Sequence, residues 1–157
     1  MSWQIVGIPS DIDGEASQDQ SGYSVSLSSD GSIVAIGSRS NDGNGEDSGH
    51  VRIFRNIKGK WEQIGNDIDG EAEGDMSGSS ISLSSDGSIV AIASIYNDGF
   101  DENGREAYSN GHVRIFENIN DSWVQIGDDI DGKNSYDKLG SSISLSSDGS
   151  VIAIGAT

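Results

Sequence analysis

Acidic side chains recur at a fixed spacing in this sequence. Two segments carry carboxylates at relative positions 1, 3, 5 and 9, namely Asp11, Asp13, Glu15 and Asp19, and then Asp67, Asp69, Glu71 and Asp75. Calcium takes about six to eight oxygen ligands, and alternate positions of a turning loop can direct several carboxylates at one ion. A third segment keeps the acids Asp129, Asp131 and Asp137. It has Lys133 at position 5, where an ammonium group would oppose a cation. The spacing therefore predicts two calcium sites and a third site that is weak or empty.

A structural role is the alternative for the same acids. Asp-Gly pairs favour turns, and an Asp at position 9 can accept hydrogen bonds from the backbone where the next strand begins. Asp75 and its equivalents would then cap a turn and bind no ion. Both interpretations are open at the level of sequence.

A second group of oxygen-bearing side chains lies in residues 41–47, where Asp42, Asn44 and Glu46 alternate. The corresponding segment offers different spacing, with Asp98, Asp101, Glu102 and Asn103. Because the spacing is not shared, the pattern favours flexible polar loops over a common ion. Loops of this kind are where a repeat protein contacts a partner.

Side chains suited to catalysis form no recognisable set. The chain has no Cys, no Gly-x-Ser-x-Gly motif and no phosphate-binding glycine loop. His50 and His112 occupy the same position of two repeated segments, which favours a structural role because catalysis rarely needs one residue per repeat. We therefore expect a protein that is not an enzyme.

Aromatic residues and one glycosylation motif complete the candidate sites. Trp3, Trp61 and Trp123 recur in register, which predicts packing between repeats, with a sugar-stacking platform as the alternative. Asn120 begins the one N-glycosylation sequon, in a turn between two expected strands.

The elements that carry these residues are repeats. Residues 21–38 recur at 77–94 and again at 139–156, and six extra residues in the second repeat fall within 97–112, in a loop. We expect a single array over residues 1–157, with a lead-in strand segment at 1–20, repeat 1 at 21–76, repeat 2 at 77–138 and a partial repeat 3 at 139–157.

Each repeat shows the pattern of four short strands. Residues 23–28 alternate apolar side chains with serines, residues 33–38 begin as a continuous apolar run, and β-favouring residues follow at 50–54 and from Trp61. The serines either allow close packing of neighbouring sheets or form a solvated face. No segment has helical periodicity. Four strands per unit predict an all-β fold of β-propeller type, made of four-stranded antiparallel blades.

The charge of the chain limits its partners. Nine Lys and Arg against 26 Asp and Glu give a formal charge of −17, so we expect no nucleic-acid surface, which would need a basic footprint. No apolar run has the length of about 20 residues that a membrane span needs, and residues 1–10 lack the regions of a signal peptide. Cations, proteins or glycans are the expected partners.

The order of motifs resembles FG-GAP-type propeller repeats, as in integrin alpha-chain heads. The resemblance is carried by Trp61 and Gln63, by Asp67–Ala72, and by residues 75, 77–84, 89–94 and 111–116. Ser21, Ser77 and Leu139 depart from the usual Phe of that family, and its calcium loop between the first two strands is here only SSDGS. The resemblance implies an extracellular or surface protein with structural, adhesive or binding roles. The chain also resembles a WD40 repeat, but it lacks the Asp that follows the aromatic residue there, since Arg55 follows Phe54 and Glu117 follows Phe116.

The expected strands amount to about two and three-quarter blades, whereas propellers have about four to eight. Three explanations follow: an excerpt of a longer propeller, a ring of several copies, or a head-to-tail filament. The sequence thus predicts a non-enzymatic structural or binding module that calcium stabilises. The alternatives are a self-assembling subunit and a lectin-like carbohydrate-binding propeller.

Overall fold

The computed structural model describes residues 11–101 and 103–157, and these form no helix. The strands in chain order are β1 Ser21–Leu27, β2 Ile33–Ser38, β3 His50–Ile57, β4 Lys60–Gln63, β5 Ile68–Asp69, β6 Ser77–Leu83, β7 Ile89–Ser94, β8 Gly99–Phe100, β9 Glu106–Ala107, β10 His112–Ile119, β11 Ser122–Gln125, β12 Ile130–Asp131, β13 Ser142–Leu145 and β14 Ile152–Gly155. The all-β, antiparallel prediction is confirmed. The expected lead-in strand falls largely on residues 1–10, which lie outside the described residues.

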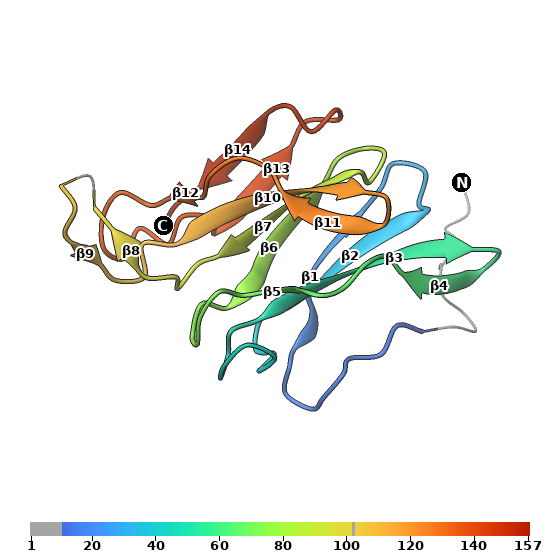
Figure 1. Cartoon of the computed structure of the whole chain (residues 1–157), viewed down its shortest axis with the longest axis horizontal. Helices are drawn as coiled ribbons and strands as arrows, with labels where there is room; N and C mark the ends of the chain where they lie inside the picture. The colour runs from blue at the N-terminus through green and yellow to red at the C-terminus, as the bar shows by residue number, and fades with distance from the viewer. Residues whose placement is uncertain (1–10, 102) are drawn as a thin grey trace.

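Each full repeat forms one antiparallel sheet (Figure 1). The strand order is β1-β2-β3-β4 in repeat 1 and β6-β7-β10-β11 in repeat 2, and the short strands β5 and β12 pair with the beginnings of β3 and β10. Repeat 3 contributes the hairpin β13-β14. The longer loop of repeat 2 carries the hairpin β8-β9, so the extra residues extend a loop and leave the sheet unchanged.

The continuously apolar strands lie at the centre of their sheets, as predicted. β2 pairs with β1 and β3, and β7 pairs with β6 and β10; in both strands every residue after the first is buried. A strand covered on both faces can be apolar along its whole length. This burial explains the change from alternating to continuous hydrophobicity between β1 and β2.

The SSDGS turn between the first two strands is held by its aspartate. Oδ1 of Asp30 accepts hydrogen bonds from the Ser28 hydroxyl at 2.8 Å, the Ser32 backbone N–H at 2.9 Å and the Ser32 hydroxyl at 2.8 Å. Gly31 has a φ of 74°, which a residue with a Cβ rarely adopts. One oxygen of the carboxylate thus accepts three hydrogen bonds within the turn, and the same arrangement recurs at Asp86 and Asp148.

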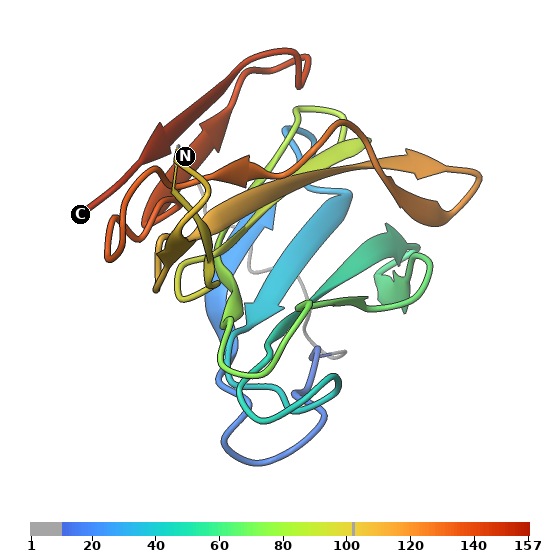
Figure 2. The same ribbon diagram turned by 60° about the vertical axis from the view of Figure 1, so that its left-hand side comes forward.

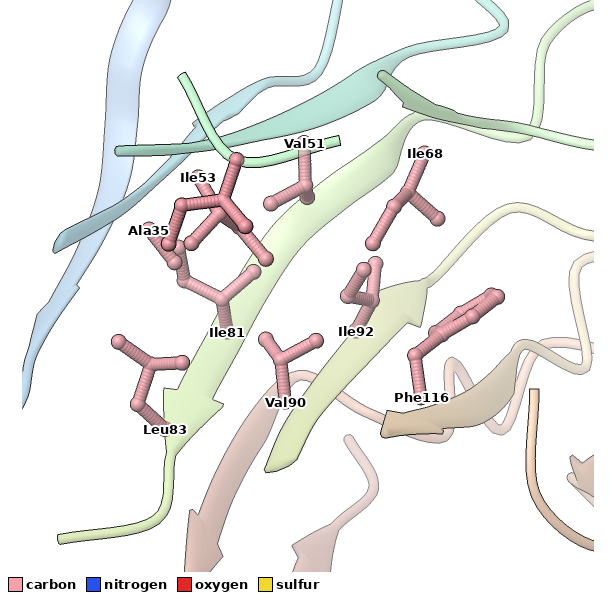
Figure 3. Close-up of a cluster of buried hydrophobic side chains, with 10 residues drawn as sticks. Ala35, Val51, Ile53, Ile68, Ile81, Leu83, Val90, Ile92 and Phe116 are labelled. Carbon is pink, nitrogen blue, oxygen red and sulfur yellow. The ribbon is translucent and has the colours of Figure 1, made fainter. Parts of the chain in front are cut away.

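The main hydrophobic cluster lies between the sheets of repeats 1 and 2 (Figure 3). Ile81 and Leu83 of β6 point across this junction, toward side chains of β2 and β3. The buried members of the cluster are Ala35, Val51, Ile53, Ile64, Ile68, Ile81, Leu83, Val90, Ile92 and Phe116. Trp123 packs against them and donates its indole N–H to the carbonyl oxygen of Ile64 at 3.0 Å. One core therefore joins two repeats.

The serines of β1 make polar contacts with β6 across this junction. The Ser24 hydroxyl donates to the carbonyl oxygen of Gly78 at 2.6 Å, and the Ser26 hydroxyl accepts from the backbone N–H of Leu83 at 2.9 Å. A Cβ at Gly37 would overlap the Gly78 carbonyl oxygen, so the backbones of the two repeats approach closely there. Of the two interpretations of the alternating serines, the structure supports close packing.

The junction between repeats 2 and 3 repeats this arrangement. The Ser82 hydroxyl accepts from the backbone N–H of Leu145 at 3.0 Å, as Ser26 does from Leu83. Ile143 and Leu145 of β13 pack against the buried cluster of Ala91, Ala93 and Val113. Figure 2 shows the three sheets following one another in chain order, and β6 contacts β1 as well as β13.

Candidate functional site

Each long third strand begins with a buried histidine. His50 opens β3 and His112 opens β10, and each side chain is 1% exposed. The short strand β5 covers the first histidine, because His50 pairs with Asp69 in the sheet, and β12 covers the second in the same way through Asp131. The recurrence of the acidic segment after each fourth strand thus places carboxylates beside an imidazole.

Two carboxylates surround the first histidine. Nδ1 of His50 lies 3.5 Å from Oδ2 of Asp67, and Glu15 joins them in a group whose potential ligand atoms, one per residue, lie within 4.8 Å of one another. Asp67 is oriented by Gln63, whose amide donates to its Oδ1 at 2.6 Å. Glu15 is paired with Arg52, whose guanidinium lies 3.5 Å from Oε1. We call His50, Glu15 and Asp67 the first triad.

The second triad, His112, Glu71 and Asp129, has the same construction. Nδ1 of His112 lies 3.8 Å from Oε2 of Glu71 and 3.9 Å from Oδ2 of Asp129. The Gln125 amide donates to Oδ1 of Asp129 at 2.6 Å, and Arg114 lies 3.5 Å from Oε1 of Glu71. Within the described parts of the chain, these triads are the two groups of His and acidic residues whose potential ligand atoms converge.

The surroundings of the second histidine favour its neutral form. Burial lowers the pKa of His112, and the nearby Arg114 guanidinium lowers it further, while Glu71, Asp129 and Asp75 act in the opposite direction. Nε2 of His112, like Nε2 of His50, is buried with no hydrogen-bond partner in the structure.

The acids at position 9 of the predicted calcium segments have the structural role. Asp75 is 3% exposed and accepts from the Ala72 backbone N–H at 3.0 Å and from the Asn97 amide at 3.3 Å. Asp19, 5% exposed, accepts likewise from Ala16 and from Asn41. Oδ2 of Asp137 accepts the backbone N–H groups of Lys133 and Asn134. All three carboxylates therefore accept backbone hydrogen bonds within their own acidic segment, which is a structural role, and ion binding by them stays a prediction.

The remaining acids of each segment face different partners. Asp67 faces His50, whereas Glu71, four residues later, faces His112. Asp13 and Asp69 each accept an arginine hydrogen bond at the backbone carbonyl, from Arg52 at 2.7 Å and from Arg114 at 2.6 Å. Asp11 and Asp131 are exposed. Calcium at these segments stays a prediction.

The acidic loop of repeat 1 packs on the second acidic segment. The Asn44 amide donates to the carbonyl oxygens of Gly70 at 2.8 Å and Glu71 at 3.1 Å, and Asp42 accepts from the Asp47 backbone N–H. The backbone carbonyl of Glu46 accepts from the Gly74 N–H. In repeat 2, Asp98 accepts from Ser109 and Asp101 from Asn103 and Arg105, while Glu102 lies outside the described residues. In the described residues, the acids of the two loops accept hydrogen bonds from different backbone groups.

Trp123 packs between repeats 1 and 2, as the first interpretation predicted, whereas the buried cluster against which Trp61 packs belongs to its own repeat. Trp61 is half-buried against the cluster of Val34, Ile36 and Phe54, and Trp123 lies against the main cluster. Trp3 lies outside the described residues. Asn120 occupies the exposed turn between β10 and β11, as expected for the sequon.

Repeat 1 exposes an apolar face of β1 whose counterpart in repeat 2 is buried. Val25 and Leu27 of β1 are 59% and 52% exposed, whereas Ile81 and Leu83 at the same positions of β6 are each 8% exposed. Tyr23 extends this face with 50% exposure. We call Tyr23, Val25 and Leu27 the leading face. The leading face is as apolar as the equivalent surface of β6, which is buried in the junction between repeats 1 and 2.

The opposite end of the array exposes the complementary surface. Val151, at the position of Ile33 and Ile89, is 64% exposed, and Ser144, at the position of Ser26 and Ser82, is also exposed. At the two inner junctions, side chains at these positions contact the following repeat. The two ends therefore differ, and each matches one side of the internal junction.

Sequence reasoning missed the two triads. It assigned the acids to loops and the histidines to structure, and it did not bring them together. The available signal was that His50, Arg52, Gln63 and Asp67 all recur in register as His112, Arg114, Gln125 and Asp129. The burial of the imidazoles and the approach of Glu15 and Glu71 from the preceding segment depend on the fold.

These features define the class of protein: an all-β repeat protein whose antiparallel sheets share cores at repeated junctions. The FG-GAP repeat model matches residues 9–54, which confirms the resemblance expected from the sequence. The FG-GAP repeat indicates a propeller-type binding or structural module, is generally found in non-enzymatic proteins and is typical of extracellular and surface proteins. A search of curated proteins gives no match. Among the described residues there is no helix able to cross a membrane.

Proposed function

We propose that this chain is a non-enzymatic structural and binding module of β-propeller repeats that acts outside the cell or at its surface. The observation that carries the proposal is the junction itself. One serine contact and the same apolar positions recur where repeat 1 joins repeat 2 and where repeat 2 joins repeat 3. Sheets joined by one repeated contact follow one another with a constant rotation, which is how propeller blades are arranged.

The distribution of the acids supports a role without catalysis. Both triads are made of the same residue types in the same arrangement, whereas an enzyme concentrates its catalytic groups in one place. The aromatic residues favour packing over sugar binding, because Trp61 and Trp123 are half-buried against hydrophobic clusters. A lectin-like blade would present an exposed aromatic platform.

Calcium is part of the proposal as a stabilising ion. The formal charge of −17 favours cations, and Asp11, Asp13 and Asp69 keep exposed side chains in the acidic segments. We expect calcium to raise Tm, and the Asp69→Asn variant to reduce this rise. An unchanged Tm in calcium and in chelator would remove calcium from the proposal.

A self-assembling subunit is the second candidate, and the two different ends of the array favour it. The leading face and the surface around Val151 and Ser144 form a heterologous pair, which gives a ring when the rotation closes and a filament when it does not. Among the described residues, strand β1 also forms an edge of its sheet, and such an edge invites association.

Light scattering combined with negative-stain electron microscopy tests both candidates. The Leu27→Lys variant puts a charge on the leading face, and Ile57→Lys is its control, because Ile57 is 42% exposed at the end of β3, outside the leading face. Regular assemblies that Leu27→Lys abolishes and Ile57→Lys leaves intact would establish the subunit. A monomer at every concentration would reject the subunit and leave the module, whose leading face then fits a further blade. Particles that show no successive blades in the electron micrographs would reject both the module and the subunit.

A further inference from the structure

The two histidine triads present donor atoms of the kinds that bind transition metals. Each offers one imidazole nitrogen and two carboxylate oxygens, and all potential ligand atoms of a triad lie within 4.8 Å of one another. Around a tetrahedral Zn²⁺ with bonds of about 2.0–2.2 Å, neighbouring donors lie about 3.4 Å apart. The carboxylates are 28–45% exposed, so small side-chain rotations can bring them to that separation.

The carboxylates of the second triad do not satisfy the neutral imidazole of His112. With the proton on Nδ1, its distances of 3.8 and 3.9 Å to the carboxylates of the second triad exceed a hydrogen bond. With the proton on Nε2, the Nδ1 lone pair faces two negative carboxylates, and repulsion results. A cation bound at Nδ1 removes this repulsion, because it attracts the lone pair and both carboxylates.

Partners outside each triad already orient the ligands. In the second triad, Gln125 donates a hydrogen bond to one oxygen of Asp129, and the other oxygen faces His112. Arg114 forms an ion pair with one oxygen of Glu71, and the other oxygen of Glu71 faces His112. Gln63 orients Asp67 in the first triad. Such supporting groups fix ligand orientation in known metal sites. Their recurrence in both repeats makes a chance encounter of exposed acids a poor explanation.

We propose that His50, Glu15 and Asp67 form one site for a divalent first-row transition metal, with Zn²⁺ as the representative ion. His112, Glu71 and Asp129 form the second. An imidazole nitrogen with two carboxylates suits Zn²⁺, whereas Ca²⁺ takes oxygen ligands in larger number. These sites differ from the predicted calcium segments, since each takes its two acids from two successive segments.

The second site joins two repeats. Glu71 lies in repeat 1, whereas His112 and Asp129 lie in repeat 2. A metal ion bound there would connect the acidic segment of one repeat to the sheet of the next. A bound ion stabilises the folded state by mass action, so zinc is expected to raise Tm.

Calorimetric titration of the chelator-treated full chain with Zn²⁺ tests the proposal, together with long-range ¹H–¹⁵N spectra of the imidazoles. The chain has two histidines, so both Nδ1 signals can be assigned by comparison with His50→Gln and His112→Gln. We expect two equivalents of zinc, one for each triad, and a shift of both Nδ1 signals on binding.

Asparagine variants identify the ligands without removing a buried side chain. Asp67→Asn and Asp129→Asn retain the oxygen that accepts from Gln63 or Gln125, and each should lose one of the two equivalents; the double variant should bind none. Asp128→Asn is the matched control, since it removes an exposed neighbouring charge, and it should bind as the wild type does. Zinc binding that leaves the imidazole signals unshifted, that survives in the double variant, or that does not occur at all would overturn the proposal.

Discussion

Ser24 of β1 donates its hydroxyl hydrogen to the carbonyl oxygen of Gly78 in β6, at 2.6 Å, across the first junction between repeats. This bond requires a glycine at position 37, because a Cβ there would overlap both the Ser24 hydroxyl and the Gly78 carbonyl oxygen. Repeat 2 has Ala93 at the corresponding position, and its Ser80 makes no such bond in the described part of the chain. The two junctions thus share a design but differ in this one contact.

Gly37→Ala should destabilise the first junction. The added methyl group displaces the Ser24 hydroxyl and pushes two backbones apart, and overpacking of this kind costs roughly 1–3 kcal/mol. Urea denaturation followed by tryptophan fluorescence measures the change in the free energy of unfolding. Ser24→Ala should cost about 1 kcal/mol, and Ser80→Ala less.

A double-mutant cycle distinguishes this mechanism from general strain. Because Gly37→Ala and Ser24→Ala remove the same hydrogen bond, the double variant should lose less stability than the sum of the single variants. Strict additivity, or no effect of Gly37→Ala, would contradict the assignment.

The strand pattern could be predicted from the sequence because it depends on local periodicity. The continuous apolar run at 33–38 indicated a strand buried on both faces, and the structure places β2 at Ile33–Ser38 in the centre of its sheet. The alternating serines were ambiguous, since a period of two shows which residues share a face of the strand but not which segment packs against that face. The neighbour is 54 residues away for Ser24 and 57 residues away for Ser26.

The candidate site was less predictable for the same reason. A structural role for Asp75 could be anticipated as one of two interpretations because its partner Ala72 is local. Asp67 and Glu71 stand four residues apart, yet one faces His50 and the other His112. Which acids converge is decided by the pairing of β5 with β3 and of β12 with β10, which spacing along the chain does not reveal.

Asp75→Ala should destabilise the protein whether or not calcium is present. The carboxylate is 3% exposed and accepts from Ala72 and Asn97, so its removal breaks two hydrogen bonds to a buried charged acceptor, at a cost of about 1–3 kcal/mol. Asp137→Ala is the comparison, and the more accessible Asp137 should give a smaller loss. Thermal unfolding in calcium and in chelator measures both. A loss seen only in calcium would show that Asp75 is an ion ligand.

Acid should weaken the SSDGS turns. The Ser32 backbone N–H and the Ser28 and Ser32 hydroxyls lower the pKa of Asp30, and Asp86 is lowered in the same way by Ser88 and Ser84. The Ser146 hydroxyl, with Ser150, lowers the pKa of Asp148 to about 2. A carboxyl group with a pKa lowered by folding stabilises the protein above its unfolded pKa of about 3.9, and this contribution is lost as the pH falls toward the folded pKa.

Urea midpoints measured from pH about 5 to about 2 test this dependence. The triple variant Asp30→Asn, Asp86→Asn, Asp148→Asn keeps an oxygen acceptor but cannot titrate, so its stability should fall less over this range than that of the wild type. Parallel curves would show that these three carboxylates do not contribute to acid sensitivity.

Gln63→Leu and Gln125→Leu should weaken zinc binding at one triad each. Each glutamine donates to Oδ1 of the neighbouring aspartate at 2.6 Å, and loss of such a supporting group costs roughly 10–100-fold in metal affinity. Each variant contains its own control, because the zinc-dependent shift of the other histidine should keep its wild-type midpoint. Titration followed by the two imidazole signals resolves the sites. Equal weakening at both histidines would point to a change in the whole fold, and unchanged midpoints at both would show that the glutamines do not orient the ligands.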